Sequence, residues 1–384
     1  MTGKRISHAF RKLHLWIALP FGAVFVLLGL SGSVIAWLPE LDRMLNPDLL
    51  RAAAPPPEQR DYPAAMQALV AKLAADPRYG QPTLLQFPLQ DDGVFVAWYR
   101  KKSGAGAGAA ALAAEISRQV MLEPGTLRIL GERNWGEPGL SRRLLMPTVF
   151  HLHRSLVSGE SGKFLVGLSG LMLCLVALSG LVLWWPRMTL KAIRQALTVS
   201  HGGSWPRFNF RLHRAAGFFV APVLLMLGFS GLYFNLPAWV LPAVNAFARV
   251  TPAQKIAPVA TPTAAQISPA QALDIAQARY PQARLTRLAL AVPASFEVRL
   301  RQPGELRQGD GATRLSIAAA DGQVLRVQDP LTARGGDRFL GWLFPLHSGE
   351  AFGTAGRIFI AAFGVAPLLF FISGVLLWRR RRRH

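Results

Sequence analysis

Four long apolar stretches constrain the fold of this chain more than any other feature of its sequence. They contain no Asp, Glu, Lys or Arg and span residues 13–38, 164–185, 215–236 and 358–378. Each is long enough to cross a hydrocarbon core of roughly 30 Å as a helix. A soluble helix of this kind would need protein on every side, which a chain of 384 residues cannot supply four times. We therefore expect four transmembrane helices.

The formal net charge of +22 is distributed unevenly along the chain. Residues 1–13, 186–214 and 379–384 carry fifteen Lys and Arg and no carboxylate, whereas all 21 acidic residues lie in 39–163 and 237–357. Clustered cations also suit nucleic acid, but their alternation with the apolar stretches follows the positive-inside pattern. We expect a bacterial inner-membrane protein with cytoplasmic termini and two periplasmic segments, no nucleic-acid partner, and a basic tail on the lipid headgroups of the bilayer.

The N-terminus has the basic start of a signal peptide. Its apolar stretch is too long for one, and no small-x-small cleavage signal follows Trp37, so we interpret it as a retained anchor. The single cysteine, Cys174, lies in the second apolar stretch. One cysteine excludes a disulfide framework, a Cys-ligated iron–sulfur cluster and a C-x-x-C-H haem attachment within this chain. Any haem must therefore be held without covalent bonds.

The chain contains two copies of one pattern. HLWIALPFGAVFVLLGLSG at 14–32 matches HRAAGFFVAPVLLMLGFSG at 213–231, and FHLHRSLVSGESGK at 150–163 matches FPLHSGEAFGTAGR at 344–357. In each match, the histidine and a later Ser-Gly keep the same separation in both copies. His14 is therefore equivalent to His213, and His153 to His347. The predicted fold class is a four-helix membrane bundle built from a two-fold internal repeat.

Both segments outside the spans have the pattern of a helix followed by an antiparallel sheet. In the second segment we predict a helix capped by Ser268 over 268–280, strands over 285–292, 296–301 and 313–318, a turn at Asp321-Gly322 and a strand over 324–327. In the first we predict a helix over 62–75, strands over 83–87, 94–99 and 116–122, and a turn at 123–125. Residues 103–114 are expected to form a flexible loop, and 54–57 and 252–262 to be linkers.

The helix, sheet and acidic-turn pattern of both segments resembles the PepSY domain. With the motifs RKLHLW, FHLHRS, RLHRAAG and PLHSGEAFGTAGR, the whole chain resembles the PepSY-associated transmembrane proteins, and among them ferric-siderophore reductases of the FoxB type. The resemblance implies an inner-membrane haem protein that passes electrons across the bilayer to reduce an iron–siderophore complex during iron uptake.

The resemblance and the charge pattern together predict an order of segments. These are a cytoplasmic N-terminus at 1–12, a span at 13–38, a periplasmic PepSY-like α+β domain at 39–150, a periplasmic His segment and span at 151–185, a cytoplasmic loop at 186–211, a span at 212–236, a second periplasmic PepSY-like domain at 237–344, a His segment and span at 345–378, and a basic tail at 379–384.

This order places one histidine pair near each membrane face. His14 and His213 each begin a helix that leaves the cytoplasm, and His153 and His347 each precede a helix that re-enters from the periplasm. We expect each pair to face across the bundle and to bind the iron of one haem b, giving two haems in all. Two axial imidazoles leave no open position on the iron, which suits electron transfer rather than oxygen chemistry.

The histidines also allow alternative interpretations. A single His at a membrane boundary is often only a solvated interfacial residue. Zinc is a further alternative, although each face would offer two or three His and no carboxylate or thiolate from the spans. His151 lies two residues before His153 and is replaced by Pro345 in the second copy. It is a candidate substitute ligand, supporting residue or substrate contact, so the outer ligand is either His151 or His153.

Several neighbours of these histidines are candidate cofactor contacts. Gly32 lies on the same helix face as His14, and Gly231 on the same face as His213, where a small residue admits either a flat macrocycle or a partner helix. We favour helix packing for both. Three cations, Lys12, Arg154 and Arg214, are candidate partners of haem propionates or simple interfacial anchors. His8, His201 and His384 have no repeat partner, and we assign them to the surface.

The leading hypothesis is an electron conduit from the cytoplasmic haem to the periplasmic haem, with Fe(III) in a siderophore as the acceptor. The chain has no glycine-rich dinucleotide motif, so the donor is a separate protein, a quinol or a reduced flavin. The rival hypothesis is a non-enzymatic membrane protein whose PepSY domains bind a periplasmic peptide or protein, with structural or pH-sensing histidines.

Overall fold

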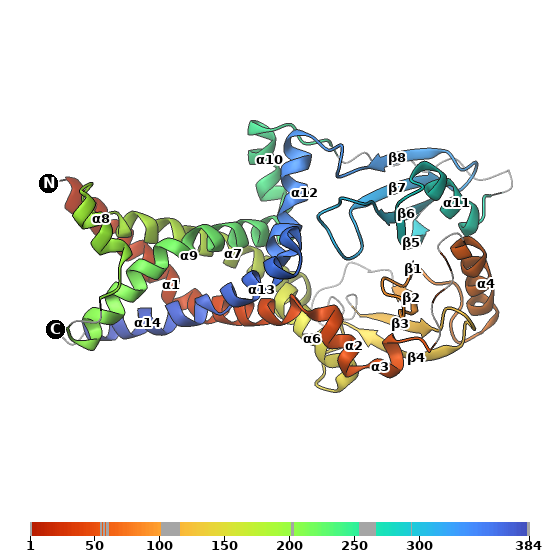
Figure 1. Ribbon diagram of the computed structural model, residues 1–384, viewed down its shortest axis with the longest axis horizontal. Helices are drawn as coiled ribbons and strands as arrows, with labels where there is room; N and C mark the ends of the chain where they lie inside the picture. The colour runs from red at the N-terminus through yellow and green to blue at the C-terminus, as the bar shows by residue number, and fades with distance from the viewer. Residues whose placement is uncertain are drawn as a thin grey trace.

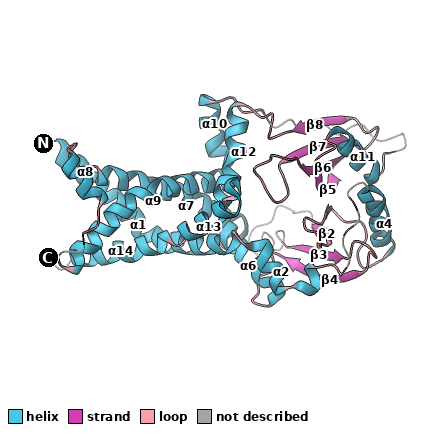
Figure 2. Ribbon diagram, in the orientation of Figure 1, coloured by secondary structure: helices cyan, strands magenta, loops and turns pink. Residues whose placement is uncertain are grey.

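The computed structural model describes residues 2–53, 56, 58, 61–100, 116–200, 203–252, 266–292 and 294–381. A bundle of long helices forms one end of the molecule and a β-sheet the other (Figure 1). Both termini lie at the end of the bundle far from the sheet, which we call the terminal end. The opposite end of the bundle is the sheet end. The strands are confined to the region beyond the sheet end (Figure 2).

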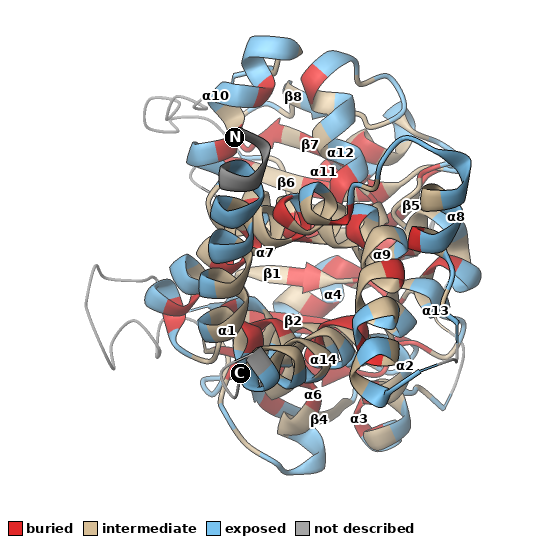
Figure 3. Ribbon diagram, turned by 90° about the vertical axis from the view of Figure 1, so that its left-hand side faces the viewer, coloured by how far each residue is buried: buried red, intermediate tan, exposed pale blue. Residues whose placement is uncertain are grey.

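Four helical segments are long and apolar enough to cross a membrane, as predicted. They are α1 (Thr2–Ile35), α7 (Gly159–Trp184), α9 (Trp205–Asn235) and the succession of η2 (Glu350–Phe352), α13 (Gly353–Phe363) and α14 (Ala366–Arg381). Large apolar side chains such as Phe219, Leu178 and Leu369 are exposed on them. Exposed positions lie along the outside of the bundle (Figure 3), as expected for helices that face lipid.

The helices extend well beyond the apolar stretches. α1 starts at Thr2 and α9 at Trp205, so His14 and His213 lie inside continuous helices. The expectation that these histidines begin their helices is wrong. Backbone hydrogen bonds of a helix continue through polar residues, so the limit of an apolar stretch marks the lipid boundary and not the helix end.

The fourth span is interrupted between α13 and α14, at Gly364 and Val365. The Ser33 hydroxyl of α1 donates a hydrogen bond to the carbonyl oxygen of Ala361 at 2.7 Å. A Cβ added to Gly29 of α1 would come within 2.3 Å of the Gly364 carbonyl oxygen. The interruption is therefore packed against α1, and a neighbouring side chain bonds to its backbone, as membrane helices require.

Glycines also bring α7 and α9 together. A Cβ on Gly170 would lie 2.5 Å from the Gly228 carbonyl oxygen, and a Cβ on Gly228 would lie 2.8 Å from that of Gly170. Only glycine permits this approach of the two backbones, which is a common way for membrane helices to pack closely. Shorter helices that were not predicted flank the spans, among them α2 (Leu38–Leu45), α3 (Pro47–Leu50), α8 (Leu190–Leu197) and α10 (Pro237–Phe247).

The sheet has eight antiparallel strands in the order β4-β3-β2-β1-β5-β6-β7-β8. The strands are β1 (Leu84–Gln86), β2 (Phe95–Arg100), β3 (Ser117–Leu122), β4 (Ile129–Trp135), β5 (Arg284–Val292), β6 (Ser295–Arg301), β7 (Thr313–Ala318) and β8 (Val324–Gln328). The seven predicted strands are confirmed, and β4 was not predicted. β1 pairs with β5, so the two segments expected as separate domains share one sheet, because each covers the open edge that the other would expose.

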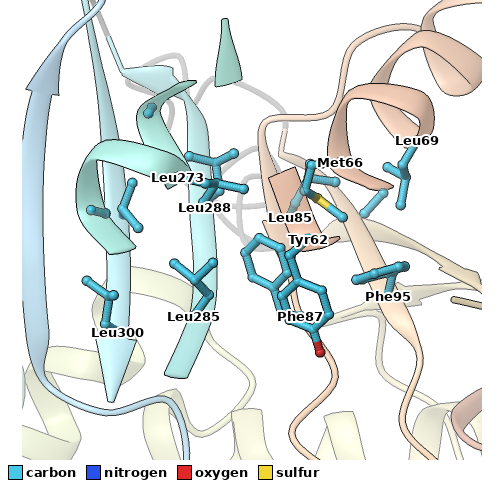
Figure 4. Packing of buried hydrophobic residues seen from close by; sticks show 14 of the residues in the cluster. Tyr62, Met66, Leu69, Leu85, Phe87, Phe95, Leu273, Leu285, Leu288 and Leu300 are labelled. Carbon is cyan, nitrogen blue, oxygen red and sulfur yellow. The ribbon is translucent and has the colours of Figure 1, made fainter. Parts of the chain in front are cut away.

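Helices α4 (Tyr62–Ala75) and α11 (Pro269–Arg279) cover one face of the sheet and confirm the two predicted helices. Ser268 caps α11 in a capping box with Gln271. Figure 4 shows the core beneath them, in which side chains from both halves meet. The rings of Tyr62 and Phe87 stack with centroids 5.1 Å apart, and Leu273 and Leu285 come from the second half. The predicted loop at 103–114 and most of both linkers lie outside the described residues.

A buried ion pair joins the sheet to the bundle. Asp42 of α2 accepts two hydrogen bonds from Arg133 of β4, at 2.8 and 2.7 Å, and both side chains are at most 5% exposed. Arg133 also donates to the Gln119 side chain and to the Arg143 carbonyl oxygen of α6 (Arg142–Ser155). These bonds offset the cost of burying the two charges. The pair thus joins α2 to β4, and the bond to Arg143 ties the first turn of α6 to the same arginine.

Breaking this pair is expected to destabilise the sheet-end structure strongly. Arg133→Ala leaves the Asp42 carboxylate buried without its partner, and we expect the free energy of unfolding to fall by about 3–5 kcal/mol. Denaturant unfolding in detergent, followed by tryptophan fluorescence, measures this. Asp48→Ala is the matched control, because Asp48 pairs with Arg142 on the surface and its loss is expected to cost about 1 kcal/mol or less. Equal losses for the two variants would contradict this role.

Candidate functional site

The four repeated histidines meet as two pairs. His14 of α1 faces His213 of α9, with ring centroids 6.5 Å apart and planes at 82°. His153 of α6 faces His347 of α12 (Gly335–Ser348), with centroids 6.1 Å apart and planes at 66°. Each pair joins residues that are far apart in the sequence and come from different halves of the chain.

The two pairs lie at opposite ends of the bundle. Ser31, which contacts His153, lies on the same helix as His14. The two residues are 17 positions apart, which corresponds to about 25 Å along the helix axis. His14 is nearer the terminal end of α1, and Ser31 is nearer the sheet end. The separation is a little less than the roughly 30 Å of a hydrocarbon core. We call the pairs the terminal-end pair (His14 and His213) and the sheet-end pair (His153 and His347).

Each histidine contacts the serine of a Ser-Gly dipeptide on a neighbouring helix. In all four cases the ring atom is Nδ1 and the partner is the serine Oγ: His14 with Ser179 at 3.1 Å, His153 with Ser31 at 3.2 Å, His213 with Ser373 at 2.7 Å, and His347 with Ser230 at 2.6 Å. The same arrangement thus recurs four times. The Ser-Gly dipeptides that mark the repeat in the sequence are themselves part of the sites.

These contacts favour one ring nitrogen as the carrier of the proton. The Ser230 hydroxyl donates to the Met226 carbonyl oxygen at 2.7 Å, so its oxygen accepts from Nδ1–H of His347. The Ser373 hydroxyl donates to the Phe370 carbonyl oxygen at 3.1 Å, so it likewise accepts from His213. A hydroxyl has one proton to donate, so while the helix carbonyl takes it the serine oxygen can only accept from the ring.

The remaining two histidines have the same tautomer for a more direct reason. His14 Nδ1 lies 3.1 Å from the Val176 carbonyl oxygen, and His153 Nδ1 lies 2.9 Å from that of Leu28. A carbonyl only accepts, so Nδ1 is the protonated nitrogen in both rings. In a neutral imidazole this leaves Nε2 with a lone pair. All four rings therefore keep Nε2 available as a metal ligand, held by a second hydrogen bond at Nδ1 as ligating histidines usually are.

The glycine after three of the four serines lies against a histidine ring. A Cβ on Gly32 would lie 3.0 Å from Cε1 of His153, and one on Gly180 would lie 3.3 Å from Cε1 of His14. Gly374 lies near His213 in the same way, at 3.8 Å. The small residue at 32 thus packs against a histidine rather than against a partner helix. A Cβ on Gly231 would meet no heavy atom of the described residues within 4 Å, so open space adjoins the sheet-end pair there.

The sheet-end pair is held in its neutral form. Burial, with a smaller contribution from the charge of His153, lowers the pKa of His347 to about 3. Burial also lowers the pKa of His153 below its ordinary value. Neutral imidazole is the form that binds a metal ion. Within the described residues, no group of three or more His, Cys, Asp or Glu side chains is arranged to hold a metal ion.

His151 is not part of the sheet-end pair. It lies two positions before His153 on α6, which turns it about 200° around the helix. Its ring is buried against Phe150 and Trp135, with centroids 5.4 and 6.4 Å away. The structure thus brings His153, and not His151, to the ring of His347.

The three candidate cations differ in their surroundings. Arg214 donates from Nη2 to the Trp184 carbonyl oxygen at 2.9 Å, which ties α9 to the end of α7. Lys12 and Arg154 are exposed. His8 is also exposed and bonds to Arg11 on its own helix, whereas His201 and His384 lie outside the described residues.

The profile of a protein family described as PepSY-associated TM region matches residues 11–381 of the chain. The match includes all four spans, both histidine pairs and the sheet. No curated protein matches the chain.

The serine contacts predict the tautomer of each ring. In cofactor-free protein with 15N-labelled histidine at neutral pH, we expect NMR to find His14, His153, His213 and His347 protonated at Nδ1. Ser230→Ala removes the acceptor of His347, so only that ring is expected to lose its preference for Nδ1–H. Ser169→Ala is the control, because this buried hydroxyl donates to the Leu165 carbonyl oxygen of its own helix. Protonation at Nε2 in the wild type would refute the assignment.

Proposed function

The chain belongs to the family of PepSY-associated transmembrane proteins, and we propose that it is a haem b protein that carries electrons across the inner membrane to reduce ferric siderophores. The observation that carries the proposal is the pairing of four imidazoles whose Nδ1–H groups are held by serine or backbone oxygens. Each ring then presents only a lone pair at Nε2. Two such rings facing each other have no hydrogen bond to share, whereas a metal ion between them satisfies both.

The donor set fits haem better than a simple metal ion. A structural zinc site needs four protein ligands and a catalytic one three, but each pair supplies two, and no cluster of three or more potential ligands occurs among the described residues. A macrocycle brings four nitrogens of its own and needs only two axial ligands. Two metal–imidazole bonds of about 2 Å, with the ring radii added, separate ring centroids by roughly 6 Å. The pairs have 6.5 and 6.1 Å.

The side chains of the site have defined tasks in this proposal. Ser31, Ser179, Ser230 and Ser373 hold the Nδ1 proton and so orient each ring. The two histidines of each pair would hold the haem iron, and with both rings bound there would be no place on it for oxygen or water. The apolar spans exclude water from the path between the two sites. Haem bound at each pair supplies a carrier that takes up and releases one electron.

The direction of transfer follows from charge. The terminal end carries Lys and Arg without any Asp or Glu in residues 1–13, 186–214 and 379–384. The positive-inside rule supports a cytoplasmic position for this end and a periplasmic position for the sheet. Because the two pairs are separated by about 25 Å along the bundle axis, they span most of the hydrocarbon core. An electron entering at the terminal-end pair would leave at the sheet-end pair.

Arginines on the sheet support an anionic acceptor. Arg287, Arg299 and Arg314 lie directly opposite one another on β5, β6 and β7. Like charges in such a row repel, and burial together with the neighbouring arginines lowers the pKa of Arg299 to about 10. Asp310 pairs with Arg287 at 2.6 Å and with Arg299 at 3.5 Å, and Glu297 lies 3.7 Å from Arg314, so the three guanidinium groups face two carboxylates.

The arginine row is connected to the sheet-end pair through the loop between β6 and β7. In this loop the guanidinium of Arg307 lies 4.0 Å from the ring centre of Phe344 on α12. Phe344 packs near Phe234, whose ring lies 5.4 Å from His347. A negatively charged ferric complex held here would lie close to the sheet-end pair. Reduction of its Fe(III) weakens binding by hard oxygen ligands, so the iron is released without destruction of the chelator.

The pairing predicts how the haem content changes on mutation. His213→Ala is expected to remove one of two haems and to leave the second, because the sheet-end pair shares no ligand with it. Haem per chain is measured by the pyridine haemochrome spectrum of purified protein. His8→Ala, an exposed histidine on the same helix as His14, is the control and should keep both haems. Loss of both or of neither in the His213 variant would refute the pairing.

The acceptor is tested with protein reduced by dithionite. We expect stopped-flow mixing with a ferric siderophore to reoxidise it, and negatively charged complexes to react fastest. Arg299→Gln is expected to slow these by about tenfold at low salt, because steering by the arginine row is weakened. Arg279→Gln, on the far side of the sheet, is the control. If the reduced protein reacts with no ferric complex, the reduction of ferric siderophores is refuted. Only electron transfer between the two pairs then remains of the proposal.

A further inference from the structure

A basic cavity lies at the terminal end of the bundle, among α8, α9 and α14. Figure 3 looks onto this end of the molecule. The cavity has a volume of about 810 Å³, which is within the range of small-molecule sites. Four arginines line it: Arg207, Arg211 and Arg214 of α9 and Arg380 of α14.

The charge of this cavity is not balanced by acidic groups. The three arginines of α9 follow one another at helical spacing and share one face. Among the described residues that line the cavity there is no Asp or Glu, and the sequence has none in 186–214 or 379–384. Planar guanidinium groups bind the oxygens of phosphate and carboxylate groups in pairs, and several around one cavity suit the larger charge and the three terminal oxygens of a phosphate monoester. The chemistry of the lining therefore calls for a phosphorylated ligand.

The rest of the lining suggests what else the ligand carries. Gln195, Thr198 and Ser200 add an amide and two hydroxyls, and Arg211 bonds to the Ser200 side chain. Phe210 and Leu377 add an aromatic and an aliphatic surface. A lipid headgroup also brings phosphate, but its acyl chains need an apolar exit. The mixture of hydroxyl, amide and ring surfaces suits a compact polar molecule with a flat ring.

The cavity is close to the terminal-end pair. Phe210 lies three residues before His213 on α9, and Leu377 lies four residues after Ser373, the serine that holds His213. Each is therefore about one helical turn, or 5.4 Å of rise, from the His213 site. A ligand in the cavity is thus near the group that receives electrons in the proposed function.

We propose that this cavity binds the phosphate of a reduced flavin mononucleotide, which would deliver electrons to the ferric haem proposed at the terminal-end pair. The inference rests on the proposed function for the direction of electron flow, but the binding site itself does not. The reduced flavin loses two electrons and two protons and becomes oxidised flavin. The electrons pass singly to the terminal-end site, and the protons go to the aqueous phase on that side of the membrane.

Binding is measured by isothermal titration calorimetry on the full-length protein in nanodiscs of neutral lipid, with oxidised flavin mononucleotide and riboflavin as a matched pair. The nucleotide is expected to bind at least tenfold more tightly than riboflavin, and inorganic phosphate to compete with it. Arg207→Gln and Arg380→Gln, both exposed and on different helices, are each expected to weaken binding about tenfold. Arg194→Gln, an exposed cation at the same end that does not line the cavity, is expected to leave binding unchanged.

Equal binding of riboflavin and its phosphate, or equal affinity in the Arg207, Arg380 and Arg194 variants, would overturn the proposal. Nanodiscs with phosphatidylglycerol provide the second arm of the experiment. If the anionic lipid abolishes nucleotide binding, the cavity belongs to a lipid headgroup and the flavin assignment is wrong. If the purified protein contains no haem but still binds the nucleotide through Arg207 and Arg380, the proposed function is refuted. The nucleotide site is then supported.

Discussion

The hydrogen bond between a histidine Nδ1 and the serine of a Ser-Gly dipeptide is the interaction on which both sites depend. It recurs four times, at 2.6 to 3.2 Å, and in each case the serine belongs to a different long helix from the histidine. Because it holds the proton at Nδ1, it leaves the Nε2 lone pair available for a metal. A shift of one helix along another would break it, so the contact also fixes how the helices are positioned along the bundle axis.

The rest of the architecture keeps these contacts in place. Close backbone approach at Gly170 and Gly228 fixes α7 against α9, and the buried pair of Asp42 and Arg133 joins α2 to β4, with a further bond from Arg133 to α6. The sheet joins the two halves through β1 and β5, so α6 and α12 bring His153 and His347 together from opposite halves. The sheet therefore holds together the two halves of the chain that supply the sheet-end pair.

Much of this fold could be predicted from local patterns, because apolar stretches and strand alternation depend on neighbouring residues. The four spans, the helix capped by Ser268 and seven strands are of this kind. The pairing of β1 with β5, the buried bond between Asp42 and Arg133 and the arginine-lined cavity could not be predicted, since each joins residues distant in sequence. The role of Ser230 could not be predicted for a different reason. In the sequence, Ser230 is recognised by its constant separation from His213 on the same helix, but in the structure its hydroxyl contacts His347.

The most direct test of the account is electron paramagnetic resonance of the oxidised wild-type protein, combined with its iron and haem content per chain. Two haems held by paired neutral imidazoles are expected to give two low-spin ferric signals and a ratio of two haems to one chain. A colourless protein from cells with ample haem would contradict the central claim. So would a high-spin signal, which would mean that the facing histidines do not fill both axial positions.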